Sequence, residues 1–267
     1  MNKIVKYILI LAVAYLVFAL AAWIFQRQIF LHPRKLTKDF QYKFDIPHQE
    51  GFVSPESGIS LNTLHFKPDS ASKGIVFYIH GNAHNLSRWG KHAHEFTNRG
   101  YEVLMYDFRE FGKSNGRLTE ANLISDAQFI YDSLKTKYPE NNIILYGRSL
   151  GTGVVTKLAS TNSPKQLILE TPYYSLPEVG WSLAPILPYN LLSEFKMPSY
   201  QWIRSVKCPI HIFHGTSDQV VPYQHSIRLI EILGKTQNKI LTTLPNGRHR
   251  GLDKFKEYQT KMDELLR

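Results

Sequence analysis

Short apolar runs, rich in β-branched and aromatic residues, recur along the chain and are separated by segments of helical length. The runs predict strands at 74–80, 102–107, 142–147, 166–170, 209–214 and 239–244. The segments between and after them predict helices at 85–98, 120–137, 150–160, 223–233 and 252–266. Such alternation is typical of an α/β fold, in which one mostly parallel sheet carries helices on both faces. Residues 43–67 are predicted to add antiparallel strands before it.

One connection between predicted strands is far longer than the rest. Residues 172–207 follow the strand that ends at Glu170, carry many aromatic and aliphatic side chains, and contain five prolines that prevent one long helix. Long ordered insertions at the carboxyl edge of a parallel sheet commonly serve as lids or binding loops. We therefore predict a lid over a pocket at about 172–207. The alternative is that its aromatic residues pack only on each other and on the sheet.

An uncharged apolar segment, residues 8–25, precedes the alternating region. As a helix it would be about 27 Å long, close to the thickness of a bilayer's hydrocarbon core. Basic residues flank both ends, so the positive-inside rule leaves the orientation open. We predict a retained single-pass membrane anchor in residues 1–26 and one globular domain in 27–267. The alternative is a signal segment cleaved near Ala19-Leu20-Ala21, which would leave a secreted or periplasmic protein.

The composition excludes several classes of protein. With 267 residues the chain is long enough to bury the core of one large domain. Its single cysteine, Cys208, excludes an internal disulfide and any cysteine-based zinc or iron–sulfur site. The net charge of +10 is compatible with nucleic acid or an anionic membrane as a partner. The basic residues are scattered without a motif that reads DNA or RNA, so we predict no nucleic-acid partner.

The segment Gly147-Arg148-Ser149-Leu150-Gly151 joins a predicted strand to a predicted helix. It has the Gly-x-Ser-x-Gly pattern of a nucleophile elbow, in which a strained turn lifts the serine hydroxyl to the top of the sheet. The two glycines leave room where side chains would collide with neighbouring backbone. The pattern alone is common, but its position between a strand and a helix predicts Ser149 as a nucleophile.

A serine hydroxyl is a poor nucleophile unless a base takes its proton. Asp218 and His249 each lie in a loop just after a predicted strand, and both follow Ser149 in the chain. This order of serine, acid and histidine is the one that the nucleophile elbow requires. We predict that Asp218 orients His249 and that His249 takes the proton from Ser149. The alternatives are Glu170 as the acid, a turn role for Asp218, and a solvated loop role for His249.

The chemistry also needs donors for the negative charge that develops on the substrate oxygen. The segment 80–83 follows the first core strand, and its backbone N–H groups at Asn82 or Ala83, with that of Leu150, are predicted to form the oxyanion hole. His80 is interpreted as a structural residue that holds this loop.

The residues His84, Arg88, His92 and Glu95 fall near helical spacing in the segment after it. We interpret them as one polar face of a helix rather than as metal ligands, and no metal or organic cofactor is predicted.

With these motifs the sequence resembles the α/β-hydrolase superfamily. Within it, the sequence is similar to membrane-anchored serine hydrolases of the depalmitoylase-like and bud-emergence-homologue branch. The segments that carry the resemblance are 80–83, 106–114, 147–151, 169–172 and 209–222. The resemblance implies the α/β-hydrolase fold, a retained N-terminal anchor, and an acyl-enzyme mechanism with Ser149, Asp218 and His249. His84 and Arg248 stand where relatives often carry glycine, and they bear on the choice of substrate.

The prediction for the whole chain is a serine hydrolase that cleaves an ester or thioester of an acyl or lipid-like substrate. A peptidase or amidase that uses the same three residues is one alternative. A non-catalytic binding protein on a hydrolase fold is another.

Overall fold

The computed structural model describes residues 2–234 and 238–267, and an eight-stranded sheet runs through its centre. In sheet order its strands are β10 (Lys239–Leu244), β9 (Ile210–Gly215), β8 (Gln166–Glu170), β7 (Ile143–Arg148), β4 (Ile75–Ile79), β6 (Glu102–Tyr106), β3 (Leu61–Phe66) and β2 (His48–Val53). The strands from β10 to β6 are parallel, whereas β3 and β2 are antiparallel to their neighbours. The predicted α/β fold and its mostly parallel sheet are confirmed.

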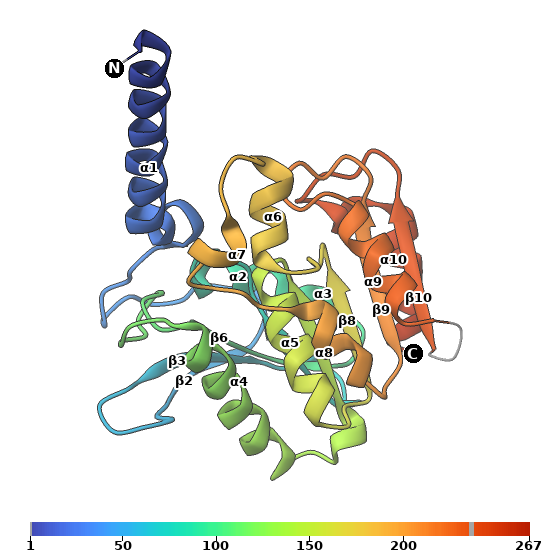
Figure 1. Ribbon diagram of the computed structural model, residues 1–267. Helices are drawn as coiled ribbons and strands as arrows, with labels where there is room; N and C mark the ends of the chain where they lie inside the picture. The colour runs from blue at the N-terminus through green and yellow to red at the C-terminus, as the bar shows by residue number, and fades with distance from the viewer. Residues whose placement is uncertain (1, 235–237) are drawn as a thin grey trace.

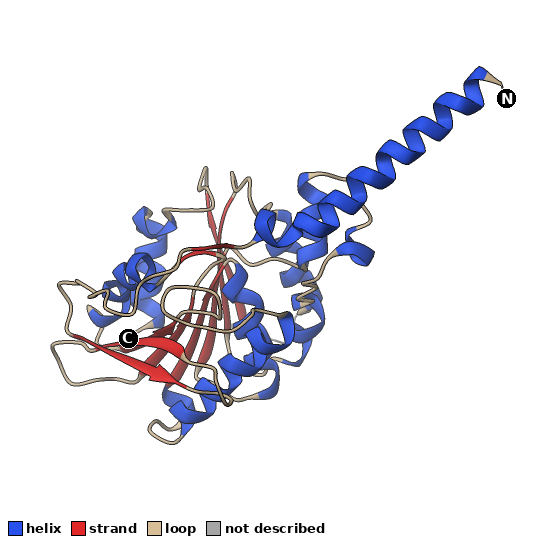
Figure 2. Ribbon diagram, turned by 90° about the vertical axis from the view of Figure 1, so that its left-hand side faces the viewer, coloured by secondary structure: helices blue, strands red, loops and turns tan. Residues whose placement is uncertain are grey.

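Helices cover both faces of this sheet (Figures 1 and 2). They are α2 (Leu86–Trp89), α3 (His94–Thr97), α4 (Glu120–Lys135), α5 (Leu150–Thr161), α9 (Gln224–Ile232) and α10 (Lys256–Leu265). Alternate residues of the fully buried β4 belong to two different apolar clusters, because side chains along a strand point to opposite faces. Ile75 and Phe77 join the cluster of α4, α5 and α9, whereas Val76 and Tyr78 join that of α2, α3 and α10.

The predicted helix 85–98 is wrong in one respect, since the structure breaks it into three short pieces. These are α2, the 3-10 turn η1 (Gly90–Ala93) and α3. Gly90 ends α2, and a Cβ atom there would lie 2.4 Å from the Phe44 ring. The helix therefore breaks at a position where the backbone packs directly against the Phe44 ring. Three further 3-10 turns are η2 (Glu140–Asn142), η3 (Ile203–Ser205) and η4 (Leu252–Lys254).

The N-terminal helix α1 (Lys3–Phe30) projects from the domain (Figures 1 and 2). None of its residues is buried, and an 18-residue window within it has a mean hydropathy of 2.8. It is long and apolar enough to cross a membrane. The helix continues past the apolar segment as far as Phe30, and β1 (His32–Pro33) then pairs with β5 (Ala83–His84).

The long insertion lies against the lower part of α1. It contains α6 (Leu176–Leu183), α7 (Tyr189–Leu192) and α8 (Ser199–Trp202). The Tyr15 hydroxyl donates to the carbonyl of Ile186 at 3.0 Å, and the Gln26 amide donates to that of Leu192 at 3.2 Å. Arg27 forms an ion pair with Glu194 at 2.6 Å. The insertion is therefore fastened to the helix that precedes the domain.

Candidate active site

The turn at Ser149 joins β7 to α5 and has strained backbone geometry. Ser149 has a φ of 51°, in the left-handed region that L residues rarely adopt. A Cβ atom on Gly147 would lie 2.6 Å from the carbonyl oxygen of Gly151, and one on Gly151 would lie 2.1 Å from that of Ile79. Both glycines are thus required for α5 to approach the ends of β7 and β4 this closely.

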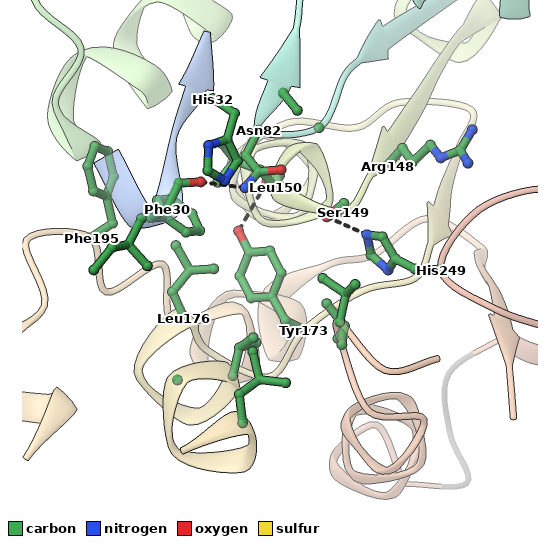
Figure 3. A pocket seen from close by; sticks show the side chains of 18 of the residues that line it. Phe30, His32, Asn82, Arg148, Ser149, Leu150, Tyr173, Leu176, Phe195 and His249 are labelled. Carbon is green, nitrogen blue, oxygen red and sulfur yellow. Dashed lines mark hydrogen bonds between the residues drawn. The ribbon is translucent and has the colours of Figure 1, made fainter. Parts of the chain in front are cut away.

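The structure brings Ser149, Asp218 and His249 together from three separate loops. Nε2 of His249 lies 3.1 Å from the Ser149 hydroxyl (Figure 3), and Nδ1 lies 2.8 Å from the Asp218 carboxylate. Because Nδ1 faces a carboxylate, it carries the ring proton, and Nε2 turns its lone pair toward the hydroxyl. This is the geometry that a histidine needs to accept a proton from a serine.

The carboxylate of Asp218 is buried and fully hydrogen-bonded. Its Oδ1 accepts the backbone N–H groups of Val220 and Val221 at 2.8 and 2.9 Å. Its Oδ2 lies between two histidines, His249 and, at 3.2 Å, His214. Burial raises the pKa of this carboxyl group, but the hydrogen bonds from His214 and His249 outweigh it and hold the pKa well below its usual value. Asp218 is therefore ionised at neutral pH.

His214 is a residue of this arrangement that the sequence analysis did not identify. It is fully buried at the end of β9, where Nε2 faces the Asp218 carboxylate and, at 2.9 Å, the carbonyl of Val221. Two acceptors at Nε2 mean that this nitrogen carries the proton. The Ser226 hydroxyl lies 2.6 Å from the other ring nitrogen, so both sides of the ring are held. The only sequence signal was its position four residues before Asp218.

Glu170, the rival acid, lies at the end of β8 and is buried. Its carboxylate forms an ion pair with Arg148 at 3.1 Å and accepts a hydrogen bond from the Tyr146 hydroxyl. Burial raises the pKa of Glu170, and the Arg148 charge opposes that rise. Among the described residues no hydrogen bond joins Glu170 to His249, so the geometry favours Asp218 as the partner of the histidine.

The interpretation of His92 and Glu95 as part of one polar helix face is wrong, because His92 lies in η1 and Glu95 in α3. Glu95 is buried and links Nδ1 of His92, at 2.7 Å, to the Tyr258 hydroxyl of α10, at 3.0 Å. The Tyr258 hydroxyl lies 3.0 Å from that of Tyr146, and Nε2 of His92 lies 3.4 Å from Arg148. With Glu170 these side chains form a closed polar ring behind the Ser149 turn. Within residues 2–234 and 238–267, no group of three or more His, Cys, Asp or Glu side chains is arranged to hold a metal ion.

The residues predicted to form the oxyanion hole lie in the same pocket as the Ser149 hydroxyl. Asn82, Ala83 and Leu150 all line the pocket that contains Ser149. The side chain of Asn82 donates to the carbonyl of Phe30 at 2.5 Å (Figure 3), so it is engaged in fixing this loop against the end of α1. Leu150 is the first residue of α5, where a backbone N–H has no acceptor within the helix.

The pocket has a volume of about 930 Å³, and its lining has two distinct sides. The side that comes from α1 and the insertion is mostly apolar, although Gln26 and Arg27 of α1 also belong to it. Its apolar members are Ala22, Trp23, Ile29, Phe30, Leu176, Val179, Leu183, Leu187, Leu192 and Phe195. The other side carries cationic residues from α2 and the loop after β10, including Arg88 and Arg250. The wall formed by α1 was not predicted, because a membrane-spanning pattern and a pocket-lining pattern are both simply apolar.

The chain is similar in sequence to several known proteins. A family model described as serine aminopeptidase, S33, matches residues 70–203. Lysophosphatidylserine lipase ABHD12 of Macaca fascicularis is 30% identical over 226 residues, which cover 68% of this chain and 55% of the relative. The Danio rerio lipase of the same name is 26% identical over 232 residues, covering 70% and 59%. The chain therefore spans less than two thirds of the length of these relatives.

Solved structures share the fold at lower sequence identity. The Pyrococcus furiosus esterase Pf2001 has a TM-score of 0.71 at 22% identity and covers 88% of this chain and 98% of its own. Est1E of Butyrivibrio proteoclasticus, with ferulic acid bound, has a TM-score of 0.66 at 19% identity, covering 81% and 97%. At these identities the likeness concerns the fold.

Replacing Gly151 with Ala is expected to destabilise the protein, because the new Cβ atom would meet the backbone of β4 rather than a movable side chain. Overpacking of this kind costs about 1–3 kcal/mol or more, so the melting temperature in detergent should fall by roughly 3–12 °C. Gly51→Ala in β2 is the control, since its nearest neighbour is the Thr63 hydroxyl at 3.0 Å. Equal melting temperatures for the two variants would contradict the close approach described here.

Replacing Asp218 with Asn is expected to lower ester hydrolysis by about 10³- to 10⁴-fold, because an amide does not hold the required His249 tautomer. Asp253→Asn, a change at an aspartate that does line the pocket, should stay within a few-fold of the wild type. Steady-state rates on a nitrophenyl ester measure both. The opposite result would be a Glu170→Gln variant that is as well folded as the wild type but inactive, together with an active Asp218→Asn variant. That result would identify Glu170 as the carboxylate partner of His249.

Proposed function

Since the chain belongs to the α/β-hydrolase family described as serine aminopeptidase S33, we propose that it is a serine hydrolase that cleaves an ester or thioester of an acyl, lipid-like substrate. The observation that carries the proposal is the hydrogen-bonded row of Ser149, His249 and Asp218 at the carboxyl edge of the sheet. The names of the relatives, lysophosphatidylserine lipase and esterase, support the same chemical class.

The proposed mechanism begins when the Ser149 oxygen attacks the carbonyl carbon of the substrate and its proton passes to Nε2 of His249. Asp218 stabilises the imidazolium through Nδ1–H. The oxygen of the tetrahedral intermediate accepts hydrogen bonds from the backbone N–H of Leu150 and that of Asn82 or Ala83. Each such donor typically contributes a hundred- to a thousand-fold in rate.

The intermediate collapses as the carbon–oxygen or carbon–sulfur bond breaks and His249 returns its proton to the leaving group. The acyl group then remains as an ester on Ser149. Water attacks this ester, His249 takes the proton of the water, and the free acid leaves as the Ser149 hydroxyl forms again.

The apolar side of the pocket supports an acyl chain as the bound part of the substrate. Phe30 of α1, Leu176 of α6 and Phe195 of the insertion point into the same space beside Ser149 (Figure 3). Burying a methylene group stabilises binding by about 0.8 kcal/mol, so a chain of several methylenes in this wall supplies substantial affinity.

We further propose that α1 is a retained single-pass membrane anchor, with residues 1–26 in and beside the bilayer, 27–267 as the hydrolase domain, and 172–207 as a lid. Large apolar side chains on the insertion support this arrangement: Trp181, Leu183 and Ile186 are each more than half exposed, and Leu191 is 81% exposed. Ile186 also accepts the hydrogen bond from Tyr15, within the apolar part of α1. An exposed apolar patch beside an apolar helix is typical of a surface that meets lipid.

The chain offers a second Ser–His pair that serves as a control for the first. Nε2 of His225 lies 3.3 Å from the Ser182 hydroxyl, but Nδ1 of that ring accepts the backbone N–H of Tyr174 at 3.1 Å. A neutral ring that accepts at Nδ1 carries its proton on Nε2, so His225 is not a base for Ser182. Proximity alone therefore does not distinguish the pairs, whereas the tautomer does.

A fluorophosphonate probe is expected to label the full-length protein in detergent, and Ser149→Ala should abolish this labelling because the probe bonds to an activated serine oxygen. Ser182→Ala should label like the wild type. Absence of labelling in the wild type would favour the non-catalytic binding protein. Aminoacyl nitroanilides, tested beside nitrophenyl acyl esters, separate the remaining alternative: faster turnover of the anilides would identify a peptidase or amidase.

Replacing Leu176 with Trp is expected to shorten the acyl chain that the pocket accepts. The kcat/KM for a dodecanoyl nitrophenyl ester should fall by about tenfold or more, whereas that for the butanoyl ester should stay within about twofold. Leu191→Trp is the matched control, because Leu191 is exposed and does not line the pocket. An equal loss on both esters, or the same loss in the control, would show that this wall does not bind the chain.

A further inference from the structure

The cationic side of the pocket contains arginines without acidic partners. The arginines that form ion pairs in the described part of the chain are Arg27, Arg99, Arg109, Arg148 and Arg228. Arg88 and Arg250 line the pocket and are not among them. The one acidic residue in the described lining is Asp253. Two unpaired guanidinium groups therefore share a pocket with the Ser149 hydroxyl.

The positive charges lie close enough to act on one another. Burial and the charges of Arg250, Arg148 and Arg34 lower the pKa of Arg88. Burial and the charges of Arg88, Arg34 and Arg250 likewise lower the pKa of the neighbouring His84. Like charges that repel in the free protein are relieved when an anion binds between them.

Arg88 is held in place by a neutral group. Its Nη1 lies 2.5 Å from Nε2 of His84, which must turn a lone pair toward this donor. His84 thus orients the guanidinium of Arg88 without an acidic side chain that would neutralise it. This gives a role to a histidine that stands where relatives of the resembled branch often carry glycine.

The cationic side adjoins the proposed reacting groups along the chain. Arg250 directly follows His249, and His84 directly follows the Asn82–Ala83 loop. An ester held at Ser149 with its acyl chain on the apolar side would present its alcohol part to this cationic side. The two sides of the pocket therefore suit the two ends of an amphiphile.

We propose that Arg88 and Arg250 form an anion-binding subsite for the alcohol part of the substrate. The preferred ester then carries a phosphate, phosphodiester or carboxylate a few bonds from the cleaved carbonyl. This inference rests on the proposed function. Guanidinium groups suit such anions because they donate paired hydrogen bonds in a planar fork.

The test compares two esters with the same acyl chain, an acylglycerol phosphate and the uncharged monoacylglycerol, on the full-length protein in neutral detergent micelles. The wild type should prefer the phosphate ester by at least about tenfold in kcat/KM. Arg88→Gln and Arg250→Gln should each lower this value for the phosphate ester by roughly tenfold, mainly through KM. The monoacylglycerol rate should stay within about twofold, and Arg88→Lys should restore part of the loss.

Arg204→Gln is the matched control, because Arg204 is an exposed arginine outside the pocket. Glycerol 3-phosphate should inhibit nitrophenyl ester hydrolysis competitively in the wild type and more weakly in both pocket variants. Equal wild-type efficiency on the two lipid esters, or equal losses on both in the variants, would overturn the subsite. If the wild type hydrolysed no ester at all, the proposed function would fail instead.

An anionic membrane surface would attract the same arginines. A third experiment therefore distinguishes attraction to the membrane surface from binding of the substrate's anion. Rates are measured on phosphatidylcholine vesicles and on vesicles that contain phosphatidylglycerol. A loss in the variants that occurs only with the anionic vesicles, and disappears in neutral micelles, would assign Arg88 and Arg250 to surface attraction and overturn the subsite.

Discussion

The site depends on the close approach of the first turn of α5 to the end of β4. That approach is allowed only because Gly151 has no side chain, since a Cβ atom would lie 2.1 Å from the Ile79 carbonyl oxygen. It holds Ser149 in a backbone conformation that an L residue does not adopt without support. The hydroxyl lies within hydrogen-bond distance of His249, and Leu150, the first residue of α5, lines the same pocket. One backbone constraint therefore positions both the proposed attacking group and one proposed donor to the oxyanion.

A polar ring lies behind this turn, in the buried interior, where apolar side chains would need no hydrogen-bond partners. It contains Arg148, Glu170, Tyr146, Tyr258 and Glu95. Two buried carboxylates beside one arginine are costly unless every group is hydrogen-bonded. Here the tyrosine hydroxyls, Arg148 and His92, which closes the ring, supply those bonds. Because Arg148 directly precedes Ser149 and Tyr258 belongs to α10, the ring joins the Ser149 turn to α10.

The parts of the fold that the sequence predicted are those that depend on local pattern. The apolar runs of β4, β7 and β8 are buried on both faces, so their signal was strong. Ser149, Asp218 and His249 were chosen because parallel strands end at one edge, and the structure does bring them together; their catalytic roles stay predictions. The break at Gly90 and the burial of Glu95 were missed, because each depends on a distant partner, Phe44 in one case and Tyr258 in the other.

The wall that α1 contributes to the pocket was missed for a related reason, and it gives the proposed anchor a second role. Hydropathy indicates that a helix avoids water, but not whether lipid, protein or substrate covers it. Here Gln26 and Arg27 bond to the insertion, while Trp23 and Phe30 line the pocket. The apolar wall of Trp23, Ile29 and Phe30 is therefore interrupted by Gln26 and Arg27, which also line the pocket. If the proposed anchor lies in a bilayer, an acyl chain that enters the pocket exchanges one largely apolar environment for another. The polar end of the proposed substrate would then contribute most of the selectivity.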